Sequence, residues 1–262
     1  NEGTPQGGVA SPILALIALH GLETAIRSCV SQGRAQRALS VVLYADDFVV
    51  IHPSLDVILK CRSAAEEWLK EMSLELKPSK THISHTLIPY EGNVGFDFLG
   101  FNVRQYPVGK HQSGRNGQGE KLGFKTIIKP SKKAIAQHIE SIRNIIQANK
   151  SAPQAAVIRK LNPIIRGWCN YYSTVCSKNT FRNCKNIIWS QLRAWARYKT
   201  GNFRLKTLNT YWQYIEGRLT FSTKSGIILM VHSDTPIKRH VKVKKDKSYF
   251  DGDVLYWSTR KG

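Results

Sequence analysis

The stretch Val41-Val42-Leu43-Tyr44-Ala45-Asp46-Asp47-Phe48-Val49-Val50-Ile51 places two apolar runs, rich in β-branched and aromatic residues, on either side of a polar segment. Such runs favour β-strands, and aspartate is common in tight turns because its carboxylate accepts hydrogen bonds from nearby backbone N–H groups. The pattern predicts a β-hairpin with two carboxylates at its tip. Ordinary turn chemistry would explain an isolated Asp-Asp pair, so the surrounding sequence has to decide whether this pair is functional.

The segments on both sides of this hairpin predict a mixed α/β region. Ser11-Pro12 is a typical helix start, and the nearly continuous apolar run over residues 13–26 predicts one buried helix. Apolar residues at a helical period predict a second helix over residues 55–72. Further on, residues 82–88 are expected to form a strand, and residues 95–101 a second short hairpin.

The second half of the chain has a helical period. Five glycines between Gly109 and Gly123 predict a flexible basic loop and a domain boundary. Three apolar stripes follow at steps of three and four, which predicts a three-helix bundle, with Pro163 expected to kink the middle helix. The expected fold class is α+β: an antiparallel sheet with helices (1–108), the loop (109–129), the bundle (130–205) and a small basic region (206–262).

The charge of the chain points to a polyanionic partner. There are 39 Lys and Arg residues against 18 Asp and Glu, a formal net charge of +21. Between Glu140 and Glu216 there is no acidic residue, but there are thirteen Lys and Arg residues. The aromatic residues of that interval are expected to be mostly core, because they recur at helical spacing. The basic side chains expected to contact phosphate are Arg159, Lys160, Arg166, Lys178, Arg182, Lys185, Arg193, Arg197, Lys242, Lys244 and Lys245.

The cysteines and the hydropathy exclude other classes of protein. Five cysteines at irregular spacings, without a C-x-x-C pair, argue against a zinc site and predict reduced, mostly buried thiols. No stretch approaches the roughly 20 apolar residues that a membrane span needs. We therefore expect no membrane partner, and a cytoplasmic or organellar-matrix protein associated with nucleic acid.

Four sequence blocks resemble the reverse transcriptase palm in order and spacing. They are Gly3-Thr4-Pro5-Gln6-Gly7-Gly8, Tyr44-Ala45-Asp46-Asp47, Leu76-Lys77-Pro78-Ser79-Lys80-Thr81 and Phe98-Leu99-Gly100-Phe101. The segment from Leu161-Asn162-Pro163 to Tyr171-Tyr172 looks like the thumb, or maturase domain, of group II intron-encoded proteins, and the tail through Tyr256-Trp257 resembles that family's DNA-binding region. The expected architecture is thus a partial palm, a helical thumb and a basic DNA-binding region.

The resemblance implies roles for individual residues. Asp46 and Asp47 would lie at a site for two Mg²⁺ ions, with Asp46 as a direct ligand and Asp47 supporting it. Gln6, Gly7 and Tyr44 would line the pocket for template and incoming nucleotide. Lys80 and Gly100 would lie near substrate or primer; a glycine there lets backbone approach nucleic acid closely. Lys80 could instead be a solvated surface lysine, and Gly100 a bulge in a hairpin.

Two departures from the family pattern limit what this stretch is expected to do alone. The sequence contains neither the further aspartate that the family's metal site takes from an upstream block nor the nuclease with which many members end. We therefore expect this stretch by itself not to polymerise.

The implied protein copies intron RNA into DNA by target-primed reverse transcription and assists splicing as a maturase. Its partners would be group II intron RNA, target DNA and deoxynucleotide triphosphates, and a homodimer is left open. Two alternatives stand beside this interpretation: an RNA-binding maturase without polymerase activity, and another bacterial-type reverse transcriptase. The intact Tyr44-Ala45-Asp46-Asp47 argues against the first, and the segment 161–172 argues against the second.

Overall fold

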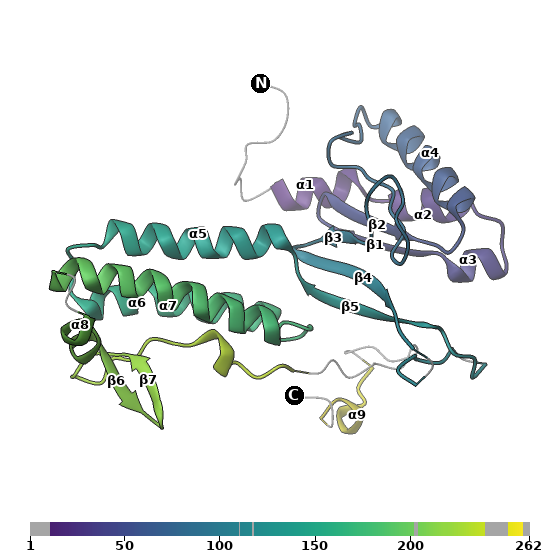
Figure 1. The fold of residues 1–262 in the computed structure, drawn as a ribbon. Coiled ribbons are helices and arrows are strands. Elements are labelled where there is room, and N and C mark those ends of the chain that lie inside the picture. The colour runs from purple at the N-terminus through teal and green to yellow at the C-terminus, as the bar shows by residue number, and fades with distance from the viewer. Residues whose placement is uncertain (1–10, 110, 117, 202–203, 239–250, 259–262) are drawn as a thin grey trace. The chain divides into compact units, whose positions relative to one another are not determined.

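The computed structural model describes residues 11–109, 111–116, 118–201, 204–238 and 251–258, and the chain divides into two compact units at Val94 and Gly95 (Figure 1). Helices and small antiparallel sheets alternate along the chain, which agrees with the expected α+β class. None of the helices described there is long and apolar enough to cross a membrane.

The first unit packs two helices against one face of a two-stranded sheet. Its elements are α1 Ser11–Ala18, α2 Leu22–Ser28, α3 Arg34–Ala38, β1 Ser40–Tyr44, β2 Asp47–Ile51 and α4 Leu55–Glu71. Since side chains alternate along a strand, Val41 and Leu43 turn to the core with their cross-strand partners Val50 and Phe48. There they meet buried residues of α2 and α4, including Leu22, Ile26, Cys61 and Ala65.

The opposite face of this sheet is open. Val42, Tyr44 and Ile51 are all exposed, and Asp47 pairs directly with Tyr44 across the strands. This face therefore carries both apolar surface and a carboxylate, next to the turn that contains Asp46.

Two expectations for the first unit were wrong. The apolar run over residues 13–26 is not one buried helix: it breaks before Leu22 at Gly21, whose φ is 99°, and Ile13 and Ile17 of α1 are more than half exposed. Residues 82–88 do not form a strand but make an isolated bridge from His85 to Val94. The His85 ring nitrogen Nδ1 accepts from the N–H groups of Leu87 and Ile88, which favours a turn over a ladder.

The second unit begins with a three-stranded antiparallel sheet in the order β3-β4-β5 and continues as a helical bundle with a second hairpin. Its elements are β3 Phe96–Phe98, β4 Phe101–Pro107, β5 Phe124–Pro130, α5 Lys132–Ala148, α6 Gln154–Tyr172, α7 Lys178–Thr200, α8 Arg204–Tyr211, β6 Trp212–Ile215, β7 Arg218–Phe221, η1 His232–Asp234 and α9 Val254–Ser258.

Part of the segment expected to be a flexible loop is a strand. The hairpin predicted over residues 95–101 is present, but β4 also pairs along its whole length with β5. Between these strands, an isolated bridge joins Arg115 to Lys121. The glycine content concealed the strand because Phe124 follows directly on Gly123, and the apolar positions of β5 are interrupted by lysines.

The three predicted helices are confirmed as α5, α6 and α7. Ser131 caps α5 by accepting from the N–H of Ala134 at 3.1 Å, as expected of serine before a first turn. The apolar stripes of the helices meet in one core that also contains Trp212, Phe221 and Leu229. The bundle therefore does not end at residue 205, because the hairpin β6–β7 and the segment after it complete its core.

A pair of buried histidines lies within this unit. The Nε2 atoms of His138 on α5 and His232 on η1 are 2.8 Å apart, so one ring donates a hydrogen bond to the other. His138 also stacks on Trp168 with ring centroids 4.3 Å apart. Burial lowers the pKa of His138 to about 4; burial, reinforced by His138, lowers the pKa of His232 to about 3. Both rings are therefore neutral near pH 7.

The cysteines behave as the sequence suggested. All five are free thiols; Cys61, Cys169 and Cys184 are buried, Cys29 is partly buried and Cys176 is exposed. Burial raises the pKa of the Cys61 and Cys184 thiols to about 12 and that of Cys169 to about 11, so these three remain protonated.

Candidate active site and nucleic-acid interface

The hairpin tip presents two carboxylates to solvent. Strand β1 ends at Tyr44, β2 starts at Asp47, and the two residues between them make the turn, with Ala45 at a positive φ of 51°. Positive φ at the first position of a two-residue turn matches the twist of the flanking strands. Tyr44, Asp46 and Asp47 are all exposed. The expected metal-site residues therefore lie together, on a turn that is held by five cross-strand pairs.

This pair can form part of a metal site. Carboxylate oxygens are the ligands that Mg²⁺ prefers. In the described ranges, His, Cys, Asp and Glu side chains do not gather in any group of three that could hold a metal ion. Asp46 and Asp47 by themselves can therefore supply only part of the oxygen ligands that such an ion needs.

The other residues expected to bind substrate do not belong to the β1–β2 hairpin. Lys80 is exposed at the end of a turn in which its N–H donates to the carbonyl of Lys77 at 2.9 Å. Gly100 belongs to the second unit, in the turn between β3 and β4, with φ of 78°. Gln6, Gly7, Lys242, Lys244 and Lys245 lie outside the described residues.

The basic side chains expected to contact phosphate follow α6 and α7. On α7, they are Lys178, Arg182, Lys185, Arg193 and Arg197, at steps of four, three, eight and four, so they lie along one side of the helix. We call this row the α7 basic stripe. It spans about 28 Å at 1.5 Å per residue. On α6, Arg159, Lys160 and Arg166 are exposed.

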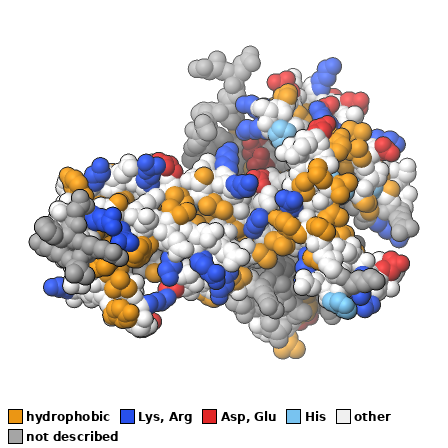
Figure 2. Space-filling view, viewed as in Figure 1, with side chains coloured by type: hydrophobic (Ala, Val, Ile, Leu, Met, Phe, Trp, Pro, Cys, Tyr) orange, Lys and Arg blue, Asp and Glu red, His pale blue; other side chains and the backbone are white. Residues whose placement is uncertain are grey.

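Neither helix carries an acidic residue to neutralise these charges. The ion pairs among described residues involve Arg27, Arg62, Arg143 and Arg218, and so none of the cations of α6 or α7. Figure 2 shows Lys and Arg side chains scattered over the helical unit, whereas Asp and Glu are more frequent over the unit that contains α4. The described face of the bundle therefore favours polyanions.

Trp189 is a surface feature that the sequence interpretation missed, because it counted the aromatic residues mainly as core. Trp195 and Trp212 are indeed buried, but Trp189 is only partly buried, and the guanidinium of Arg193 lies over its ring at 4.6 Å from the centroid. The spacing of four between Trp189 and Arg193 was the available signal.

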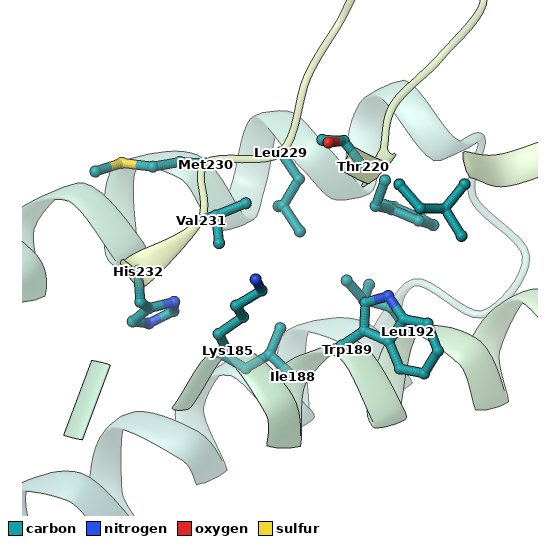
Figure 3. Close-up of a pocket in the computed structure, with 11 residues that line it drawn as sticks. Lys185, Ile188, Trp189, Leu192, Thr220, Leu229, Met230, Val231 and His232 are labelled. Carbon is teal, nitrogen blue, oxygen red and sulfur yellow. The ribbon is translucent and has the colours of Figure 1, made fainter. Parts of the chain in front are cut away.

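An apolar recess lies beside Trp189. Figure 3 shows Lys185, Ile188, Trp189 and Leu192 of α7 facing Leu229, Val231 and His232 across it, with the Lys185 side chain extending into the space. On the side of this recess, the α7 basic stripe is bordered by apolar side chains.

Two family models match the chain. Residues 1–103 match the reverse transcriptase (RNA-dependent DNA polymerase) family, and residues 135–214 match the group II intron, maturase-specific domain. The chain belongs to the group II intron-encoded reverse transcriptase/maturase family. No curated protein matches it.

The two matches divide the expected site between them. In this reverse transcriptase/maturase, the carboxylate pair and Gly100 fall within the reverse transcriptase match, and the cations of α6 and α7 fall within the maturase-specific match. The maturase-specific match reaches beyond α7 to Tyr214, in agreement with the core that Trp212 shares with the helices.

Proposed function

We propose that the protein is an RNA-directed DNA polymerase of a group II intron that also binds the intron RNA as a maturase, so that it supports both splicing and mobility by target-primed reverse transcription. The observation that carries the polymerase activity is the pair of exposed carboxylates at the tip of the β1–β2 hairpin. Two adjacent, exposed aspartates at the tip of a paired hairpin suit a hard divalent cation that also binds a triphosphate substrate.

In this proposal, the hairpin belongs to the palm and the helical bundle to the thumb. Asp46 would be a direct ligand of Mg²⁺. Asp47, on the open face beside Tyr44, would support that ligand. Mg²⁺ held there would supply activation of the attacking 3′ hydroxyl and stabilisation of the leaving pyrophosphate. The open face of the β1–β2 sheet leaves room for substrate next to both carboxylates, and Tyr44 offers an exposed ring to it.

The maturase activity rests on the helices α6 and α7. The eight cations named above have no acidic neighbour on their own helices, and several lie about one helical turn apart, so they can contact successive phosphates of a bound strand. Such contacts hold RNA without reading its sequence. A maturase without polymerase activity is the second candidate, because these two helices alone would suffice for RNA binding.

Primer extension on an RNA template with Mg²⁺ tests the proposal, with the longest protein of this reading frame as the enzyme. The wild type should extend the primer, and Asp46→Asn should not, although both bind intron RNA equally. Glu67→Gln is the matched control, since Glu67 is an exposed carboxylate of α4 in the same unit. If neither wild type nor Asp46→Asn extends while both promote splicing, the protein is a maturase alone.

A further inference from the structure

Two consecutive tyrosines at the end of α6 hold the turn between β3 and β4. The hydroxyl of Tyr171 donates to the carbonyl of Leu99 at 2.9 Å, and the hydroxyl of Tyr172 donates to the carbonyl of Gly100 at 3.2 Å. Each contact joins residues 72 positions apart in the sequence. All four residues belong to the second compact unit. We call this arrangement the tyrosine clamp.

The rings of the clamp reinforce the hydrogen bonds. Phe101, the first residue of β4, stacks on Tyr171 with centroids 5.0 Å apart and meets Tyr172 edge-on at 5.1 Å. The carbonyl of Gly100 also accepts from the N–H of Ser131 at 2.8 Å, directly before α5. The turn is therefore attached to the starts or ends of two bundle helices.

The clamp leaves no space for a side chain at Gly100. A Cβ built there would lie 2.6 Å from the Tyr172 hydroxyl oxygen, and φ is 78° at Gly100 and 49° at Leu99. Both central residues of the turn thus have the left-handed conformation that fits a tight hairpin. Position 100 thus requires glycine because Tyr172 of α6 packs over the turn. A close approach of nucleic acid to the backbone would be a second reason.

The tyrosines do more than fill the core. Tyr172 is buried, but Tyr171 is half exposed. Burial of apolar area therefore stabilises the position of Tyr171 less, and its contacts with the turn matter more. Burial, with a smaller contribution from Tyr171, raises the pKa of Tyr172, so its hydroxyl remains protonated and able to donate at neutral pH.

The clamp connects the two family matches. Leu99 and Gly100 lie in the reverse transcriptase match, and Tyr171 and Tyr172 in the maturase-specific match. We propose that Tyr171 and Tyr172 are positioning residues for polymerisation: they set the Leu99–Gly100 turn at which the primer lies, so the helices that bind RNA also fix the primer-side turn. This inference rests on the proposed polymerase function and on the place near substrate or primer that the resemblance implies for Gly100.

Tyr171→Phe tests the role, because it removes the hydroxyl and keeps the ring against Phe101. In steady-state primer extension by the longest protein of this reading frame, we expect KM for the primer–template to rise, or kcat to fall, by roughly 3- to 10-fold, the effect of one hydrogen bond. The melting temperature should fall by no more than a few degrees, and the affinity for intron RNA should stay at its wild-type value. Tyr198→Phe is the matched control, because Tyr198 is an exposed tyrosine of α7.

A double-mutant cycle tests the geometry without relying on catalysis. Gly100→Ala should lower the melting temperature, and adding Tyr172→Phe should recover part of that loss, because the oxygen that the new Cβ meets has been removed. Strictly additive losses in this cycle would contradict the clamp itself.

The outcomes separate the clamp from the polymerase. A wild type that extends primers while Tyr171→Phe keeps wild-type KM and kcat overturns the positioning role alone. A wild type that does not extend removes the proposed polymerase function, and the positioning role with it, although the coupling between Gly100 and Tyr172 would still be measurable as melting temperature.

Discussion

In the proposed function, the two compact units carry different kinds of site. The first unit has a small core and concentrates its chemistry in two adjacent carboxylates on an exposed turn. The second has a larger core and carries nine Lys and Arg residues spread over two long helices. A concentrated site can be abolished by one side chain without loss of the fold, whereas a distributed one weakens in small steps as charges are removed.

The largest expected effect is at the hairpin tip, where the two aspartates should not be equivalent. Asp46→Asn should reduce primer extension on the order of 1,000-fold, as expected for a direct metal ligand, and Asp47→Asn by about 10- to 100-fold, as expected for a supporting group. Single-turnover extension at saturating primer measures both. Equal losses would mean that both carboxylates bind metal directly, and a larger loss for Asp47→Asn would reverse the assignment.

Whether the two units unfold independently can be tested by a substitution that leaves a cavity in the core of one of them. Leu161 is fully buried in the core of the bundle, so Leu161→Ala should destabilise the second unit by about 2 to 5 kcal/mol. Leu22→Ala would make the corresponding cavity in the first unit. Hydrogen exchange resolved by peptide should show each change confined to its own unit. Loss of protection in both units from either variant would show that they unfold together.

Acid should weaken the second unit through the two buried histidines. Their pKa values in the folded protein are below the ordinary value of 6.5, so the unfolded chain binds more protons and stability falls as the pH drops below 6.5. Between pH 7 and pH 5.5 we expect a loss of roughly 2 to 3 kcal/mol for the pair.

Urea unfolding of the second unit across this pH range measures the loss. A matched titration of His138→Gln should give a shallower slope, because one of the two protonation sites is gone. A pH-independent free energy of unfolding between pH 7 and 5.5 would contradict the neutral buried pair.

The smallest effect per residue is expected on the α7 basic stripe. Arg182→Gln/Lys185→Gln should lower the salt dependence of RNA binding, the slope of log K against log [salt], by about 1.5 if each cation contacts one phosphate. Lys60→Gln/Lys70→Gln removes the same charge from exposed positions of α4 and should change the slope less. Equal slopes for the two variants would mean that net charge, rather than the stripe, attracts RNA.

The sequence was most informative where local patterns decide the structure. Alternating apolar runs around Ala45-Asp46 predicted the hairpin, and steps of three and four predicted α5, α6 and α7. Two predictions were wrong because a single residue outweighed the local pattern. Gly21 interrupts an apolar run that otherwise favours one helix. The His85 ring accepts backbone hydrogen bonds that a strand would use in its ladder.

Contacts between distant segments could not be predicted from local patterns. Nothing near Gly100 in the sequence indicates that a tyrosine hydroxyl from α6 occupies the space of its missing side chain. The His138–His232 pair likewise joins residues 94 positions apart. The site residues stay a prediction: the sequence placed the carboxylate pair on a hairpin turn and the cations on helices, and the structure has them there. The partial exposure of Trp189 under Arg193 could not be predicted, because it depends on which side of α7 faces the core.

The shared core of the bundle has a practical consequence for making fragments of this protein. A fragment of residues 130–205, cut where the composition changes, would lose Trp212, Phe221 and Leu229 and uncover the apolar surface that they bury, so it should aggregate during expression. A fragment of residues 95–238 keeps the three-stranded sheet, the bundle and the hairpin that closes it, and is the better choice for a soluble RNA-binding module.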